Sequence, residues 1–205
     1  MNNFKDYIRQ WLNHVNPYTG LAIKDDPYLF LIETGNELGQ YRLYPSNPSL
    51  SSNTIPTKTW IRDIVRFIKS IDKNHLVLDG VDEELSDENF SISETDVFSR
   101  HYYWADYQTP SVLARKAASV SRPFIIGEFD SHINVDWLKY LEREPNIKGS
   151  FFWSIYGHAD NQVDYVRHDD GYTLYYKESS SYSDLLKLAN HARRMQGLPE
   201  ITALP

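Results

Sequence analysis

The sequence predicts an α/β fold with a parallel sheet, and two patterns carry that prediction. Short apolar runs of strand length alternate along the chain with longer stretches whose apolar residues recur at helical spacing. Strands that alternate with helices are joined by right-handed crossovers, which place the strands parallel to one another. A chain of 205 residues can bury one substantial core. We therefore expect a single domain over residues 1–205.

The first third of the chain predicts a helix, a strand and a second helix. Residues 3–14 predict an amphipathic helix, because their apolar side chains fall on one helical face. Residues 28–32 (YLFLI) are apolar throughout, which is typical of a strand buried on both faces. A polar loop follows at 39–55, and its length indicates a functional loop such as a lid or a subsite wall. The next helix begins near Pro56 and runs through Ile71.

The remaining elements continue the alternation. Residues 75–80 (HLVLDG) predict a second buried strand, and the acidic run after it, 82–88, predicts a solvated surface loop. Further strands are expected at 96–104, 123–130 and 147–158, and further helices at 111–119, 135–144 and 182–196. A polar, aromatic loop at 159–180 separates the last strand from the last helix.

Two of the predicted strands end in carboxylates. Asn36 and Glu37 follow the first apolar run, and Glu128 closes the run PFIIGEFD. The carboxyl ends of the strands carry the active site in α/β barrels, and glycoside hydrolysis needs one carboxylic acid of raised pKa and one carboxylate. Local pattern alone favours a turn and a helix cap at Asn36 and Glu37, and the second strand-ending glutamate changes that balance. Both neighbours can face one cleft only if a bulge or a strand end at Gly35 breaks the period of two.

The third and fifth strands supply further candidates. His101 and Tyr103 lie two residues apart and therefore share a face, whereas Tyr102 points the other way and is expected to pack under a helix. An imidazole and a phenol hydroxyl can hydrogen-bond a carboxylate and keep it ionised. For His101 taken alone, a structural histidine is the better interpretation. Trp153, near the end of the fifth strand, is a candidate sugar platform or a core residue.

Composition excludes several classes of function. A net charge of −7 argues against nucleic acid or an acidic membrane surface as a partner, and no apolar run approaches membrane-spanning length. Without cysteine, disulfides and thiolate metal sites are excluded. Met1 is followed at once by polar residues, which do not form a secretory signal. The sequence predicts neither a compartment nor an oligomeric state.

Four motifs with their spacing resemble one family. NPYTGLAIKDDP…ETGNEL, HYY, GEFD and FFWSIYGH resemble the fungal endo-β-1,4-mannanase-like branch of glycoside hydrolase family 5, in the retaining clan. The resemblance covers most of the chain and implies a polysaccharide substrate (β-mannan or a related β-glycan), with no metal and no cofactor. It implies that Glu37 is the acid/base, that Glu128 is the nucleophile and that the peptide bond after Trp153 is cis. It also implies substrate-binding roles for Asn36, His101, Tyr103 and Trp153.

The same resemblance implies a partial TIM (β/α)8 barrel. Aligned in this way, the chain begins in the helix after barrel strand three, so it holds about five parallel βα units (strands four to eight), with strands one to three missing. A complete barrel is typically ~250 residues long. Family members carry an Arg and a His in the missing part, which support the nucleophile and the substrate. The truncated chain is therefore expected to have little or no activity. The resemblance also implies a secreted protein, because family members are typically secreted.

Two alternatives stay open. One is a β-glucanase of the same clan, because no motif reads the configuration of the 2-hydroxyl of the sugar. The other is a non-catalytic remnant that binds carbohydrate through its aromatic side chains. Assays on mannan against glucan distinguish the first alternative, and sugar binding without turnover would support the second.

Overall fold

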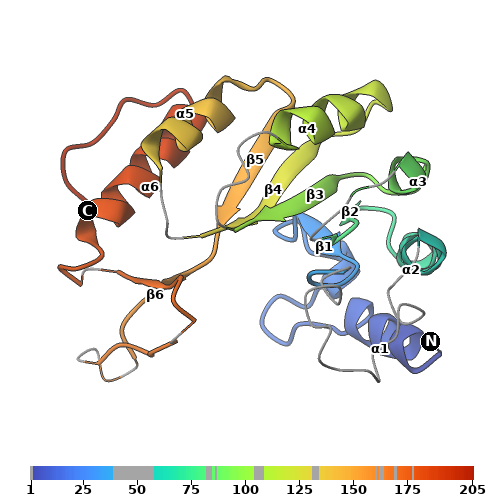
Figure 1. Cartoon of the computed structure of the whole chain (residues 1–205). Helices are drawn as coiled ribbons and strands as arrows, with labels where there is room; N and C mark the ends of the chain where they lie inside the picture. Colours follow the sequence, from blue (N-terminus) through green and yellow to red (C-terminus); the bar gives the residue numbers. More distant parts are fainter. Residues whose placement is uncertain are drawn as a thin grey trace, which may run out of the picture. The chain divides into compact units, whose positions relative to one another are not determined.

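A computed structural model of the chain describes residues 2–38, 58–81, 85, 87–103, 109–130, 134–159, 161, 164–168, 170–176 and 178–205 (Figure 1). The chain forms two compact units. Unit 1 comprises Met1–Arg100 and Lys116–Pro123, and unit 2 comprises His101–Arg115 and Phe124–Pro205. The predicted loop 39–55, the helix start near Pro56 and residues 82–84 of the acidic run lie outside the described residues. The expectation of a single domain stays a prediction.

Unit 1 contains the predicted alternation of helices and strands. Its elements are α1 (Asn2–Leu12), the 3-10 helix η1 (Ile23–Asp25), β1 (Leu31–Glu33), α2 (Lys58–Ile71), β2 (Leu76–Leu78), α3 (Asp87–Phe90) and the first part of β3 (Phe98–Tyr102). β1 pairs with β2 in parallel, and Leu78 forms a parallel bridge with Val97, just before β3. The core of unit 1 consists of almost fully buried side chains from α1, α2 and β2, namely Leu12, Ile61, Ile64, Val65, Ile68 and Val77.

β1 begins later than the strand that was predicted at residues 28–32, and the residues before it are more exposed than predicted. Tyr28 is 96% exposed and Phe30 is 68% exposed, so the prediction of a strand buried on both faces is wrong for this part. The reason is a turn made by Asp26. Its side chain accepts a hydrogen bond from the backbone N–H of Tyr28 (3.0 Å), and its backbone oxygen accepts one from Leu29 (3.1 Å). These two N–H groups are therefore not available to a strand ladder.

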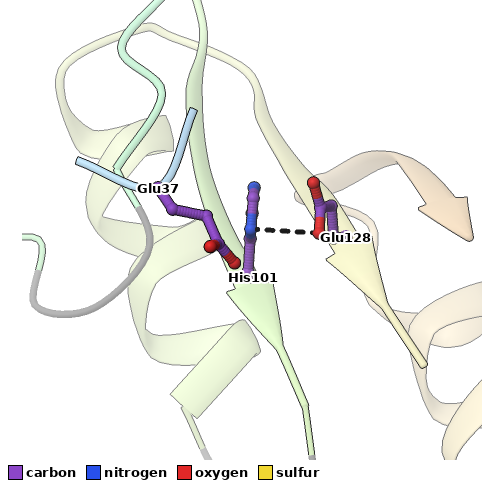
Figure 2. A group of neighbouring side chains, drawn as sticks. All are labelled: Glu37, His101 and Glu128. Atoms are coloured by element: carbon purple, nitrogen blue, oxygen red, sulfur yellow. Dashed lines mark ion pairs between the residues drawn. The ribbon is translucent and has the colours of Figure 1, made fainter. Parts of the chain in front are cut away.

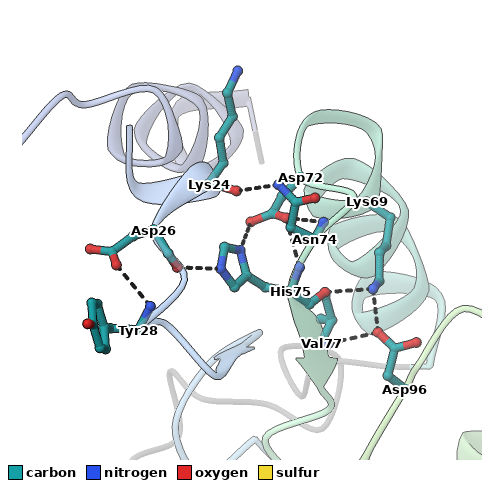
Figure 3. A network of polar contacts seen from close by, with 9 residues as sticks. All are labelled: Lys24, Asp26, Tyr28, Lys69, Asp72, Asn74, His75, Val77 and Asp96. Carbon is teal, nitrogen blue, oxygen red and sulfur yellow. Dashed lines mark hydrogen bonds and ion pairs between the residues drawn. The ribbon is translucent and has the colours of Figure 1, made fainter. Parts of the chain in front are cut away.

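A polar network ties the turn before β1 to α2 and β2 (Figure 3). In the buried His75 ring, Nδ1 lies 2.7 Å from Asp72 Oδ2, and Nε2 lies 2.9 Å from the backbone oxygen of Asp26. Lys69 donates to the backbone oxygen of His75 (2.8 Å) and pairs with Asp96 (2.5 Å). Burial opposes both charges, yet the hydrogen bond between them lowers the pKa of Asp72 and raises the pKa of His75. Only an imidazolium can donate from both ring nitrogens, so this geometry favours the ion pair.

Unit 2 contains the remaining strands and helices. Its elements are the end of β3, the first part of α4 (Thr109–Ser119), β4 (Phe124–Phe129), α5 (Val135–Arg143), β5 (Ile147–Phe152), β6 (Ile155–Tyr156), β7 (Leu174–Tyr175) and α6 (Tyr182–Met195). β3, β4 and β5 form one sheet in that order, and β4 runs parallel to β5 (Figure 1). Asn134 caps α5 by accepting hydrogen bonds from the backbone N–H groups of Asp136 (2.8 Å) and Trp137 (3.3 Å).

The predicted fifth strand, 147–158, is divided into two strands. β5 ends at Phe152, and the backbone N–H of Trp153 still donates to the oxygen of Phe129 in β4 (2.9 Å). The Trp153–Ser154 peptide bond is cis, as the resemblance implied. Beyond it β6 pairs in parallel with β7, so the chain leaves β4 and takes a partner from the segment predicted as a loop, 159–180. A two-residue strand such as β7 carries too few residues to show alternation.

The acidic run is helical where the structure describes it. Asp87 and Glu88 open α3, so the prediction of a loop is wrong there, and acidic residues suit the first turn of a helix. Their side chains are 84% and 68% exposed, which confirms a solvated surface for these two.

None of the helices in the described parts of the chain is long and apolar enough to cross a membrane. Parallel strands with intervening helices fit a partial α/β barrel, and the count of five units stays a prediction.

Candidate active site

The first candidate residues follow a bulge at the end of β1. Glu33 lies opposite Leu78 in the parallel ladder, and the next bridge joins Leu38 to Val81. Five steps along β1 therefore match three steps along β2, which leaves two extra residues in the segment that holds Asn36. This arrangement confirms the predicted interruption of the strand at Gly35.

Glu37 has an unusual backbone conformation within this bulge. Its φ angle is +52°, in the left-handed region that non-glycine residues rarely adopt. The backbone N–H of the next residue, Leu38, donates to the oxygen of Gly80 (2.9 Å), which returns the chain to the ladder. The left-handed residue breaks the alternation of side chains, so Asn36 and Glu37 are not forced onto opposite faces.

The backbones at Gly35 and Gly80 cross closely, and this crossing constrains the bulge. Gly80 has a φ angle of +72°, and a Cβ atom placed on it would lie 1.9 Å from the backbone oxygen of Gly35. The hydroxyl of Thr34 donates to the backbone oxygen of Asp79 (2.6 Å), which joins the two strands just before the crossing. Glycine is therefore required at position 80 both for its conformation and for space.

Beside this crossing lies a buried carboxyl group, Asp79. Its Oδ1 accepts hydrogen bonds from the backbone N–H (3.0 Å) and the hydroxyl (3.2 Å) of Ser99, and its Oδ2 has no hydrogen-bond partner among the described residues. Complete burial raises the pKa of Asp79 to about 8, and the negative charge of Glu33 adds to the effect. Asp79 is therefore a neutral acid at pH 7.

The second candidate glutamate, Glu128, lies in β4 and contacts two side chains from the end of β3. The Nδ1 atom of His101 lies 3.4 Å from Glu128 Oε2, drawn as a dashed line in Figure 2. The hydroxyl of Tyr103 donates a hydrogen bond to the same oxygen. Tyr102 points to the other face, where its ring lies 6.3 Å from the ring of Trp137 in α5. The predicted division of these three side chains between two faces is confirmed.

This environment suits a carboxylate that acts while ionised. The side chain of His101 is 1% exposed and that of Glu128 is 13% exposed, so the pair is largely shielded from water. The Tyr103 hydroxyl donates to one carboxylate oxygen and the His101 ring lies beside the same oxygen, and contacts of this kind favour the charged form of a carboxylate and restrict its orientation. A fixed, ionised carboxylate is what attack on a sugar carbon requires.

Trp153 is half-exposed beside the end of β5. It is 37% exposed, and its indole N–H donates to Asp170 Oδ2 at 2.8 Å. Asp170 and its neighbour Tyr172 were not predicted as site residues, because both lie in a segment without periodicity. The only local signal is the Asp-Gly pair at 170–171, which indicates a turn.

The structure thus brings together part of the predicted set. Unit 2 holds Glu128 with His101 and Tyr103 around one carboxylate, and it also holds Trp153. Glu37 belongs to unit 1, together with Asn36, so the distance between the two candidate glutamates stays a prediction. The expected absence of a metal or a cofactor also stays a prediction.

Comparisons with known proteins identify relatives of this chain. The family model described as GH family 5 beta-mannosidase-like matches residues 1–114. Mannan endo-1,4-beta-mannosidase 4 of Oryza sativa subsp. japonica is 33% identical over 79 residues, which make up 38% of this chain and 15% of that protein. Mannan endo-1,4-beta-mannosidase 4 of Solanum lycopersicum is 23% identical, with 90% of this chain and 55% of that protein covered.

Solved structures of mannanases also match this chain in fold. The crystal structure of an endo-1,4-beta-mannanase from Rhizomucor miehei matches with a TM-score of 0.72 at 26% identity, covering 96% of this chain and 61% of that chain. An endo-beta-1,4-mannanase from Thermotoga petrophila matches with a TM-score of 0.71 at 19% identity, covering 96% and 50%. The chain therefore spans about half to three fifths of the structures that it resembles.

Proposed function

The chain belongs to glycoside hydrolase family 5, as a beta-mannosidase-like member, and on that premise we propose that it carries the catalytic glutamates of a retaining β-mannan hydrolase. The family resemblance read from the four sequence motifs is thereby confirmed. The observation that carries the proposal is the geometry at Glu128. A carboxylate at the carboxyl end of a parallel strand is held by an imidazole and a phenol from the neighbouring strand.

We assign complementary roles to the two glutamates. In the first step Glu128 attacks the anomeric carbon, the bond from that carbon to the leaving oxygen breaks, and Glu37 gives its proton to that oxygen. In the second step Glu37 takes a proton from water, the water oxygen bonds to the anomeric carbon, and Glu128 leaves as a carboxylate. Two inversions at one carbon retain its configuration.

The remaining candidates have supporting roles in this proposal. Tyr103 and His101 keep the nucleophile oriented between the two steps, and Asn36 binds a substrate hydroxyl next to the acid. The half-exposed ring of Trp153 supports the sugar at the scissile bond, because aromatic faces stack on the apolar faces of sugars. β1 to β5 are assigned to barrel strands four to eight.

Turnover by the 205-residue chain alone is expected to be low. The apolar side chains of Phe30, Phe151 and Ile155 are 68%, 51% and 49% exposed. Exposed apolar surface of this kind favours association between chains, and small misplacements of catalytic groups slow a reaction strongly. A test of the roles should therefore need only one chemical step per molecule.

Such a test is covalent labelling with 2-deoxy-2-fluoro-β-mannosyl fluoride. The fluorine at C2 slows both steps, and the fluoride leaving group needs no acid, so the adduct accumulates. A bond forms between Glu128 and the anomeric carbon, the bond from that carbon to fluorine breaks, and fluoride leaves. We expect mass spectrometry to find one label on the peptide that contains Glu128. The label should be lost in Glu128→Gln and kept in Glu37→Gln and in the control Glu178→Gln.

Other outcomes would contradict the proposal in distinct ways. A label on Glu37 would reverse the roles of the two glutamates. Labelling by the 2-fluoro-glucosyl reagent alone would favour a β-glucanase of the same clan. Calorimetric binding of mannohexaose without any label would indicate the non-catalytic, carbohydrate-binding remnant.

A further inference from the structure

Asp170 connects the candidate sugar platform to a turn through its two carboxylate oxygens. Oδ2 accepts the indole N–H of Trp153 at 2.8 Å. Oδ1 accepts the backbone N–H groups of Tyr172 (2.9 Å) and Thr173 (3.0 Å), and the hydroxyl of Thr173 lies at 3.0 Å from the same oxygen. The side chain is 20% exposed, so these contacts are only partly open to water. One oxygen therefore holds a ring, and the other shapes the backbone before β7.

The turn shaped by Asp170 reaches the nucleophile through two aromatic rings. The ring of Tyr172 lies edge-on to the ring of Tyr103, with 5.0 Å between their centres. The hydroxyl of Tyr103 donates to Glu128. Edge-to-face rings restrict each other's rotation. A shift of the turn would therefore move the group that orients the Glu128 carboxylate.

The ring of Trp153 also has an aromatic neighbour. Its neighbour His168 lies edge-on at 6.1 Å, and that imidazole is itself stacked on Tyr156 at 5.3 Å. His168 Nδ1 also lies 3.1 Å from Asp170 Oδ2, so the rings of Trp153 and His168 contact the same carboxylate oxygen. Burial opposes the charge of Asp170, but hydrogen bonds from the Tyr172 backbone and from Trp153 hold its pKa below the usual range. The acceptor is thus ionised at neutral pH.

We propose that Asp170 is a positioning residue for the proposed reaction, fixing the plane of Trp153 and the placement of Tyr172 against Tyr103. The inference rests on the proposed function for its catalytic meaning. A platform that is held before the sugar arrives loses less side-chain entropy on binding. The carboxylate is suited to this role because a charged acceptor makes a stronger hydrogen bond than a neutral one.

Two substitutions separate the ring contacts of Asp170 from its turn contacts. Asp170→Asn keeps one carbonyl oxygen for the turn but places an amide N–H₂ where Oδ2 was, so the contacts with the Trp153 indole and the His168 ring are lost while the turn is kept. Asp170→Ala removes both contacts. We expect faster hydrogen exchange of the Trp153 indole N–H in both variants, measured by NMR with the resonance assigned through Trp153→Phe. We expect altered Tyr103 ring signals in Asp170→Ala alone, and no change in the control Asp164→Asn.

Binding of mannohexaose provides the functional test. Asp170→Asn should weaken binding by about tenfold, the scale of one hydrogen bond to a charged group. In a Trp153→Phe background the same change should have little further effect, because the indole donor is already absent. Additive losses, or indole exchange that is unchanged in Asp170→Asn, would overturn the positioning role. A different result would contradict the proposed function alone. In that case the wild-type chain binds no mannohexaose, while the Trp153 indole N–H still exchanges faster in the Asp170 variants than in wild type, which supports the positioning of the ring.

Discussion

At the scale of single residues, two buried aspartates of unit 1 respond to burial in opposite ways. Asp72 and Asp79 are each 1% exposed. Burial opposes ionisation of both, but Asp72 faces the His75 imidazole, and this partner lowers its pKa. Burial raises the pKa of Asp79 to about 8, because its donors from Ser99 and the Gly80 backbone are neutral and the nearby charge of Glu33 is negative. A cationic partner, rather than burial, decides which carboxyl group is charged.

The neutral state of Asp79 predicts a distinct dependence of stability on pH. The folded pKa of about 8 lies above the ordinary value of 3.8, so folding binds a proton over that interval. The stabilising contribution of protonated Asp79 is complete below the lower value and is lost as pH rises toward the higher one. The loss has a slope of at most about 1.4 kcal/mol per pH unit. Asp79→Asn keeps an oxygen for Ser99 and cannot ionise.

Urea unfolding of wild type and Asp79→Asn between pH 6 and pH 8 measures this effect. The free energy of unfolding of the variant, relative to that of wild type, should increase with pH. The control Asp63→Asn changes a half-exposed carboxyl group paired with Lys5 and should show no comparable slope. A difference between Asp79→Asn and wild type that is constant with pH would contradict the neutral-acid assignment.

Residue-level prediction succeeded where strand alternation decides the outcome. The period of two placed His101 and Tyr103 on one face, and the structure finds both at Glu128. It failed for Asp170, because the hydrogen bond to Trp153 joins residues 17 apart across an aperiodic segment. Such a contact depends on how β6 and β7 pair, which no local pattern encodes.

At the scale of elements, the junction of β1 and β2 depends on Gly80. Gly80→Ala should be strongly destabilising for two reasons. The left-handed backbone costs an alanine about 1–2 kcal/mol, and the added Cβ would lie 1.9 Å from the Gly35 oxygen, a backbone atom that cannot move aside alone. Gly20→Ala is a matched control, because Gly20 has a φ angle of +71° but nothing within 4 Å of an added Cβ.

Chemical denaturation of the two glycine variants separates conformation from space. Gly20→Ala should lose only the conformational term, whereas Gly80→Ala should lose clearly more and shift the Glu37 bulge. Equal losses for both variants would mean that the close crossing of the backbones does not constrain the fold.

The ends of β1 and β5 show why element bounds were harder to predict than element types. Residues 28–30 are apolar but lie before the strand, because the Asp26 turn takes the backbone N–H groups of Tyr28 and Leu29. The apolar run 147–158 looks continuous but changes partner after Phe152. Hydrophobic pattern predicts what can be buried, and hydrogen-bond partners decide where a strand ends.

At the scale of the whole molecule, the two candidate glutamates lie in different units. Glu37 stands on the bulge of unit 1, and Glu128 stands in the sheet of unit 2. Each position was predicted from a strand that ends in a carboxylate. The expected distance between the two carboxyl groups depends on the order of strands in a barrel. That order was inferred from the family resemblance, because no local property of either strand predicts it.

Glu37 and Glu128 are proposed to form one retaining pair, and the distance between their two carboxyl groups decides whether they do. That distance should be measured in a crystal structure of the chain with bound manno-oligosaccharide, whether or not the chain turns over. A retaining pair should show a distance of about 5–5.5 Å, with both carboxyl groups on the same side of the sheet and the sugar between them. A separation of about 9 Å or more, or glutamates that face opposite sides, would contradict it.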